Sequence, residues 1–94
     1  MQTSSDMQIV DAQVTLPDDV DLHARPAANF VRTAMRFSAK LSVGADEKEV
    51  DAKSLLSVLS LGARRGTSIR LRAEGDDAAA AIEALVTTVA GLRE

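Results

Sequence analysis

The feature that most constrains this chain is a repeated switch between two spacings of apolar residues. In residues 10–16 every second residue is apolar, a spacing typical of a strand with one buried face. From Ala24 onward the apolar residues recur at intervals of three and four, which indicates one face of a helix. This helical face consists of Ala27, Phe30, Val31, Ala34 and Met35. The alternation therefore favours a mixed fold in which helices pack on a sheet.

The same two spacings predict the remaining elements. In chain order these are strands at 39–43 and 48–52, a helix at 55–61, a strand at 68–73 and a helix at 78–89. Gly44-Ala45-Asp46 is expected to form a turn between the first two strands. Ser54 is a good N-cap for the middle helix, and Gly75-Asp76-Asp77 opens the last helix with Asp at its cap.

The resulting order, β-α-β-β-α-β-α, predicts an α+β fold. Because the outward positions of the strands are polar, we expect an antiparallel sheet of four strands with the three helices on one face. Periodicity alone does not separate this arrangement from a ferredoxin-like sheet with another strand order. The 94 residues suffice for one domain, expected over 7–94, and the polar residues 1–6 are interpreted as a disordered tail.

Composition narrows the class of function. A net charge of −3 and an aromatic content of 2% argue against a nucleic-acid binder, which needs a basic face and stacking platforms. The chain contains no cysteine, so disulfides, thiolate metal sites and cysteine nucleophiles are excluded. No apolar run approaches the ~18 residues of a membrane span, and the start carries no secretory signal pattern. We therefore expect a soluble cytoplasmic protein without membrane contact.

The only histidine, His23, lies where a loop is predicted to become a helix. Helix N-termini present unpaired N–H groups and a partial positive charge, which together favour an anion. Arg25 adds a fork of donors that matches a phosphate, and Pro26 suits the first helical turn. An imidazole in this setting could accept a phosphoryl group. A lone histidine at a helix start is more often a cap or a surface residue, and the residues alone leave the two interpretations at even odds.

Two other kinds of site are disfavoured by the residues. No second histidine or cysteine completes a metal site, and no cofactor is expected. Nothing resembles the nucleophile elbow of a serine hydrolase, and the domain is too small for a substrate cleft. Arg64-Arg65-Gly66 is interpreted as a solvated loop without a role.

A second segment of interest surrounds Ser54. Its hydroxyl is expected to cap the helix and would also be accessible to a kinase, since the helix dipole tolerates a phosphate there. The helix that follows carries more leucines than a short helix can bury, among them Leu55, Leu56 and Leu59. Either the helix is well covered or some of these leucines form an exposed patch for a partner.

The residues 22–27, Leu-His-Ala-Arg-Pro-Ala, resemble the active-site signature of the bacterial histidine-containing phosphocarrier (HPr) family of the phosphoenolpyruvate-dependent phosphotransferase system. Residues 52–55, Ala-Lys-Ser-Leu, resemble the family's second signature. Leu61-Gly62, Gly66-Thr67 and Ala73-Glu74-Gly75 resemble its later segments. The resemblance covers nearly all of the chain beyond residue 6 and implies an open-faced β-sandwich.

The resemblance also implies a mechanism and partners. Enzyme I would transfer a phosphoryl group to Nδ1 of His23, and the phosphohistidine would donate it to enzyme IIA domains in sugar uptake. Arg25 matches the arginine that contacts the phosphate, and Ser54 matches a serine that a kinase phosphorylates in some bacteria. Leu55, Leu56 and Leu59 match the partner-binding helix, with Arg32 and Lys53 supplying positive charge. The implied protein is a carrier, expected to be monomeric, and not a stand-alone enzyme.

Other hypotheses stay open at this stage. One is a regulatory binding module in which phosphorylated Ser54 controls docking to a transcriptional regulator and His23 is idle. Another keeps the histidine chemistry but serves a nitrogen-related or dihydroxyacetone-kinase branch. The chain also departs from the family at Asp21, where glycine is usual. A carboxylate there would repel a phosphate, so we expect Asp21 to point to solvent.

Overall fold

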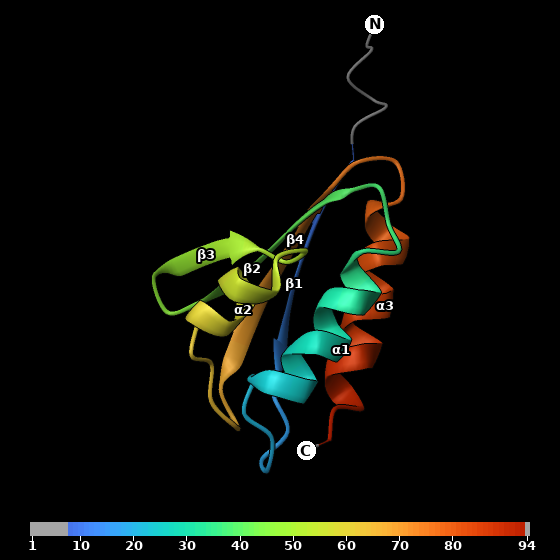
Figure 1. Cartoon of the computed structure of the whole chain (residues 1–94). Helices are drawn as coiled ribbons and strands as arrows, with labels where there is room; N and C mark the ends of the chain where they lie inside the picture. The colour runs from blue at the N-terminus through green and yellow to red at the C-terminus, as the bar shows by residue number, and fades with distance from the viewer. Residues whose placement is uncertain (1–7, 94) are drawn as a thin grey trace, which may run out of the picture.

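The computed structural model describes residues 8–93, which form one sheet of four strands and three helices (Figure 1). The elements in chain order are β1 Ile9–Thr15, α1 Ala24–Ala34, β2 Lys40–Ala45, β3 Lys48–Asp51, α2 Leu55–Ser60, β4 Ser68–Glu74 and α3 Ala78–Ala90. No helix in this part of the chain is long and apolar enough to cross a membrane. The tail expected at 1–6 lies outside the described residues.

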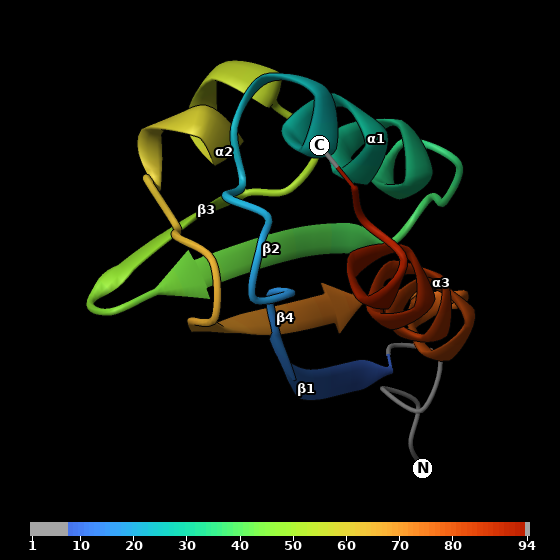
Figure 2. The ribbon, with the colours of Figure 1, turned by 90° about the horizontal axis from the view of Figure 1, so that it is seen from below.

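The four strands form a single antiparallel sheet in the order β1-β4-β2-β3. β1 and β4 pair along their whole length, from Ile9 opposite Glu74 to Thr15 opposite Ser68. This order distinguishes the sheet from the ferredoxin-like alternative that periodicity left open. Viewed from below, all three helices lie on one side of the sheet (Figure 2). The predicted fold class, an open-faced sandwich in the order β-α-β-β-α-β-α, is therefore confirmed.

The hydrophobic core lies between the sheet and the helices. β4 shows most clearly how alternating residues of a strand build this core, because Ile69, Leu71 and Ala73 are buried while the residues between them face outward. The largest buried side chain is Phe30 of α1, which is fully covered. Burial of one such side chain stabilises a fold by about 1.5–3 kcal/mol. The predicted helical face of α1 is also confirmed, except that Met35 is exposed at its end.

The turn predicted at Gly44-Ala45-Asp46 lies two residues later in the structure. Gly44 and Ala45 pair with Glu49 and Lys48, so they belong to β2 and only two residues, 46 and 47, form the loop. Asp46 takes the positive φ of 56° that such a tight hairpin loop needs. Aspartate tolerates this conformation, which is why glycine is not required there.

Two smaller differences concern burial. Val10, Ala12 and Val14 are only half-buried because β1 is an edge strand. In α3, Val86 is half-buried, although Ile82, Leu85 and Val89 of the same helix are buried.

One end of the sheet holds two loops together, and this arrangement positions the candidate site. The loop after β1 and the loop before β4 leave the sheet at the paired residues Thr15 and Ser68. Main-chain hydrogen bonds then join the loops, from Leu16 N–H to Thr67 O at 2.8 Å and from Leu22 N–H to Ala63 O at 2.9 Å. The start of α1 is thereby fixed beside residues 63–67.

Candidate functional site

His23 is the N-cap residue of α1, as its position in the sequence predicted. Its backbone is extended, with φ −135° and ψ 174°, and its carbonyl accepts the first helical hydrogen bond, from Ala27 N–H at 3.2 Å. The side chain makes no capping hydrogen bond and is 57% exposed. Leu22 beside it is buried and anchors the backbone. The imidazole is thus held at the helix start but remains accessible.

The first turn of α1 offers unpaired hydrogen-bond donors. Within residues 8–93, the N–H groups of Ala24 and Arg25 have no acceptor, and Pro26 has no N–H. The Arg25 side chain is exposed and takes part in none of the hydrogen bonds or ion pairs of these residues. These donors add to the partial positive charge of the helix end. The arrangement suits an anion beside the imidazole.

Ala24 has an unusual backbone for an alanine, with a φ of 33°. For a residue with a Cβ atom, the left-handed region costs about 1–2 kcal/mol. Such strain persists only where the surroundings impose it, and it is common at functional sites. The strained residue here directly follows the histidine and contributes one of the two N–H groups that have no acceptor in the described part of the chain.

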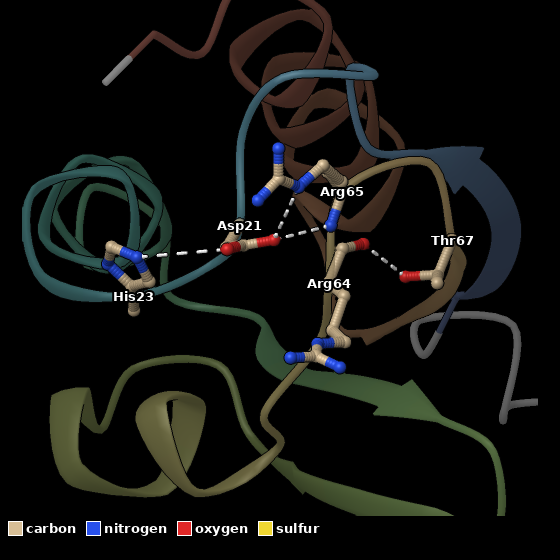
Figure 3. A network of polar contacts seen from close by, with 5 residues as sticks. All are labelled: Asp21, His23, Arg64, Arg65 and Thr67. Carbon is tan, nitrogen blue, oxygen red and sulfur yellow. Dashed lines mark hydrogen bonds and ion pairs between the residues drawn. The ribbon is translucent and has the colours of Figure 1, made fainter.

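Asp21 does not point to solvent as expected but turns toward the loop before β4 (Figure 3). Its Oδ1 accepts a 2.8 Å hydrogen bond from Arg65 N–H, and the Arg65 Nε lies 3.6 Å from the same oxygen. Its Oδ2 lies 4.0 Å from Nε2 of His23. The side chain is 27% exposed. The bond from Arg65 N–H and the positive charges nearby lower the pKa of Asp21 below 3.8.

Sequence reasoning missed the part played by Arg64 and Arg65. The peptide N–H of Arg65 anchors Asp21, and both arginine side chains contribute positive charge near that carboxylate. In Figure 3 their two guanidinium groups point to different sides of the loop. The aspartate at position 21, where the family usually has glycine, was the one sequence feature that pointed to an unusual contact here. It did not identify Arg65, 44 residues later, as the partner.

Ser54 caps α2 as predicted, since its Oγ accepts a hydrogen bond from Ser57 N–H at 3.3 Å. The leucines of α2 divide between core and surface. Leu55 and Leu56 are exposed, at 40% and 80%, whereas Leu59 is half-buried against the core. The structure thus favours an exposed apolar patch over a fully covered helix, and Leu55 and Leu56 form it.

The two basic residues expected around this patch are placed differently. Lys53 is half-buried, and its Nζ donates a 2.6 Å hydrogen bond to Phe37 O. Arg32 is exposed, donates to Asn29 Oδ1 at 2.8 Å, and lines a hollow between α1 and α3 with Arg36 and Thr88. Each of the two basic side chains is thus tied to an oxygen of its own surroundings, Phe37 O for Lys53 and Asn29 Oδ1 for Arg32.

The fold and the exposed histidine at a helix start define a small carrier domain, and comparison with known proteins shows its family. A family model described as "PTS HPr component phosphorylation site" matches residues 10–90. The chain belongs to the HPr family, the phosphocarriers of the phosphotransferase system. The predicted resemblance and phosphocarrier class are confirmed.

Individual relatives support the same family. The phosphocarrier protein HPr of Haloferax volcanii is 51% identical over 74 residues, which cover 77% of this chain and 83% of that protein. The HPr-like protein Crh of Halalkalibacterium halodurans is 40% identical over 81 residues, covering 86% of this chain and 96% of that protein. The crystal structure of HPr-C-His from Thermoanaerobacter tengcongensis superimposes with a TM-score of 0.83 at 43% identity, covering 86% and 91% of the two chains.

Proposed function

We propose that His23 carries the phosphoryl group, accepting it from phosphorylated enzyme I and donating it to enzyme IIA domains in sugar uptake. The observation that carries this proposal is an exposed imidazole without a capping bond, beside two N–H groups that find no acceptor among residues 8–93, at a helix start. An exposed site suits a carrier, because each partner must reach the same ring in turn. The absence of cysteine supports a cytoplasmic place of action.

The chemistry follows from the donors around the ring. A lone pair on the imidazole attacks phosphorus, and charge builds on the phosphoryl oxygens during transfer. The N–H groups of Ala24 and Arg25 and the Arg25 guanidinium are the groups that can stabilise this charge. We assign Arg25 the role of contacting the phosphate.

Partner docking is proposed for the exposed start of α2. Leu55 and Leu56 offer apolar surface, and Leu59 supports them from the core side. Arg32 contributes positive charge at the flank of α1, and Lys53 contributes it from its anchored position, toward acidic partner surfaces. Enzyme I and enzyme IIA would use this surface one after the other.

Incubation with enzyme I and phosphoenolpyruvate tests the assignment of His23. We expect a mass gain of one phosphoryl group that is lost on brief acid treatment, as a phosphorus–nitrogen bond requires. His23→Ala should show no such gain while keeping the melting temperature of the wild type, because the exposed ring makes no capping bond. Equal acid-labile labelling of His23→Ala would refute the proposal.

A second role is proposed for Ser54, as a regulatory phosphorylation site for a serine kinase. Its hydroxyl lies at a helix start directly before the exposed Leu55 and Leu56, so a phosphate would place negative charge at the edge of the docking patch. Crh of Bacillus subtilis, which this chain resembles, is described as a catabolite repression HPr, and we propose a transcriptional regulator as the further partner of this chain.

A further inference from the structure

We infer that Asp21 is a positioning residue that holds the proton of His23 on Nε2 and leaves Nδ1 free to take the phosphoryl group. This inference rests on the proposed role of His23 as the phosphoryl site. It concerns the residue at which the chain departs from the family pattern. Three contacts carry it, and all involve the Asp21 carboxylate.

The first step is that the carboxylate is fixed in place. Arg65 N–H donates to Oδ1 at 2.8 Å, and Arg65 Nε lies 3.6 Å from that oxygen. The peptide donor is itself held, because the loop that contains it is bonded to the loop before α1 by Leu22 N–H to Ala63 O. The second carboxylate oxygen, Oδ2, is therefore left to face the imidazole.

The second step is that one particular ring atom faces this oxygen. Nε2 of His23 lies 4.0 Å from Oδ2. This distance is close enough for an ion pair but too long for a hydrogen bond. In Figure 3 the other ring nitrogen lies on the side of the ring away from Asp21. Turning the ring over would bring a carbon atom to the carboxylate instead, so the observed orientation is the favourable one.

The third step concerns the proton. A neutral imidazole carries one N–H, and a carboxylate next to a ring nitrogen stabilises the tautomer with the proton on that nitrogen. The proton therefore stays on Nε2, and Nδ1 keeps its lone pair. In the transfer, that lone pair forms the bond to phosphorus, and the leaving group of the donor keeps the electrons of the bond that breaks. The ring then carries a positive charge beside the Asp21 carboxylate.

Repulsion between Asp21 and the phosphate is the opposing effect. The carboxylate faces Nε2, whereas the phosphoryl group would be attached on the other side of the ring. The attraction between the carboxylate and the ring therefore acts over a shorter distance than the repulsion between the carboxylate and the phosphoryl group. The Arg65 guanidinium and the nearby Arg64 offset part of the negative charge. Attraction to the protonated ring should therefore outweigh the repulsion.

Asp21→Asn provides the sharpest test. The amide oxygen can still accept from Arg65 N–H, but the amide NH₂ then faces Nε2 and requires that atom to be the acceptor. The proton therefore moves to Nδ1. In this tautomer Nδ1 has no free lone pair with which to attack phosphorus. Asp21→Gly removes the bias without reversing it. Asp19→Asn is a matched control, because Asp19 is an exposed carboxylate of the same loop.

The tautomer is read from the ¹⁵N chemical shifts of His23 at alkaline pH. We expect the fraction with the proton on Nε2 to fall in the order wild type, Asp21→Gly, Asp21→Asn, with Asp19→Asn equal to wild type. Single-turnover transfer from phosphorylated enzyme I should be slower by about tenfold or more in Asp21→Asn. Melting curves of all variants are recorded alongside.

Equal tautomer fractions in wild type and Asp21→Asn would overturn the inference, as would transfer by Asp21→Asn at the wild-type rate. If Asp21→Asn does not fold, Asp21→Gly decides, and a tautomer fraction unchanged from wild type overturns the inference. A wild-type protein that accepts no phosphoryl group on His23 would instead refute the proposed function, and the tautomer order would still decide the role of Asp21.

Discussion

At the scale of single residues, the candidate site depends on side chains that the fold does not use. His23 and Arg25 are exposed, and within residues 8–93 neither forms a hydrogen bond through its side chain. The bonds of the neighbourhood are made instead by the backbone and by Asp21. Stability and phosphoryl transfer should therefore be separable here by substitution.

Arg25→Ala should impair transfer without affecting the fold. The guanidinium has no partner in the part of the chain that the structure describes, so its loss should change the melting temperature by no more than about 2–4 °C. Removal of one donor to a developing charge slows a reaction by about 10²-fold. Rapid-quench measurement of transfer from enzyme I checks this. A large fall in melting temperature with a normal rate would contradict it.

At the scale of elements, the start of each helix is built differently. α1 begins with a histidine whose side chain does not cap the helix, whereas α2 begins with a serine whose side chain does. α3 begins with Asp77, whose carboxylate reaches across to the chain before β2 instead of capping its own helix. The last two helix starts contribute to stability and can be tested one at a time.

Ser54→Ala should destabilise the protein by about 1 kcal/mol, the usual loss when an N-cap acceptor is removed. Ser54→Asp keeps an acceptor at the cap and should retain the wild-type stability. It should nevertheless slow transfer from enzyme I, because it puts negative charge beside Leu55 and Leu56. Urea unfolding and transfer rates check the pair. Equal stability of Ser54→Ala and wild type would contradict the capping role.

Asp77 should make stability depend on pH. Its carboxylate accepts from Ser38 N–H at 2.9 Å and Ala39 N–H at 2.8 Å, and these bonds lower the pKa of Asp77 below 3.8. A lowered pKa in the folded state gives stability that is present above pH 3.8 and is lost as the pH falls through the folded value.

Asp77→Ala should accordingly lower the melting temperature by several degrees at neutral pH, and the difference from wild type should shrink as the pH falls below 3.8. Asp76→Ala is the matched control, since the neighbouring carboxylate is exposed and forms no hydrogen bond within residues 8–93. Thermal unfolding across this pH range checks both. A difference that stays constant down to the lowest pH would argue against the role of Asp77.

What the sequence could predict follows from the range of the interactions. The period of the apolar residues depends on near neighbours, so all seven elements and the Ser54 cap were predicted correctly. The turn after β2 was misplaced because strand pairing holds Gly44 in the sheet. The contacts of Asp77 with Ser38 and Ala39, and of Asp21 with Arg65, join distant segments, and local patterns carry no information about them.

In the whole molecule, the apolar patch of α2 and strand β1 lie at opposite edges of the sheet. α2 packs next to β3, and β1 is the other edge of the order β1-β4-β2-β3. Leu56 on α2 and Ile9 on β1 are both exposed apolar residues. The same substitution at the two positions therefore distinguishes the loss of a docking contact from the general effect of a more polar surface.

Leu56→Ser should slow transfer at low partner concentration by about tenfold, which corresponds to about 1.4 kcal/mol of lost contact energy. Ile9→Ser should leave the rate unchanged. Both should melt like the wild type, because neither side chain belongs to the core. Transfer rates measured against enzyme I concentration check this. Docking at α2 would be contradicted if Ile9→Ser slowed the transfer, or if Leu56→Ser transferred at the wild-type rate.

The pairing of the first strand with the last has a consequence for synthesis of the protein on the ribosome. Ile9 pairs with Glu74, and the loop before α1 is held by Ala63 and Arg65, so an emerging N-terminal half has none of these partners. Non-local pairing of this kind must wait until the later segments are available. The histidine should thus acquire its surroundings only after β4 has left the exit tunnel, and nascent chains stalled before that point should be unable to accept phosphate.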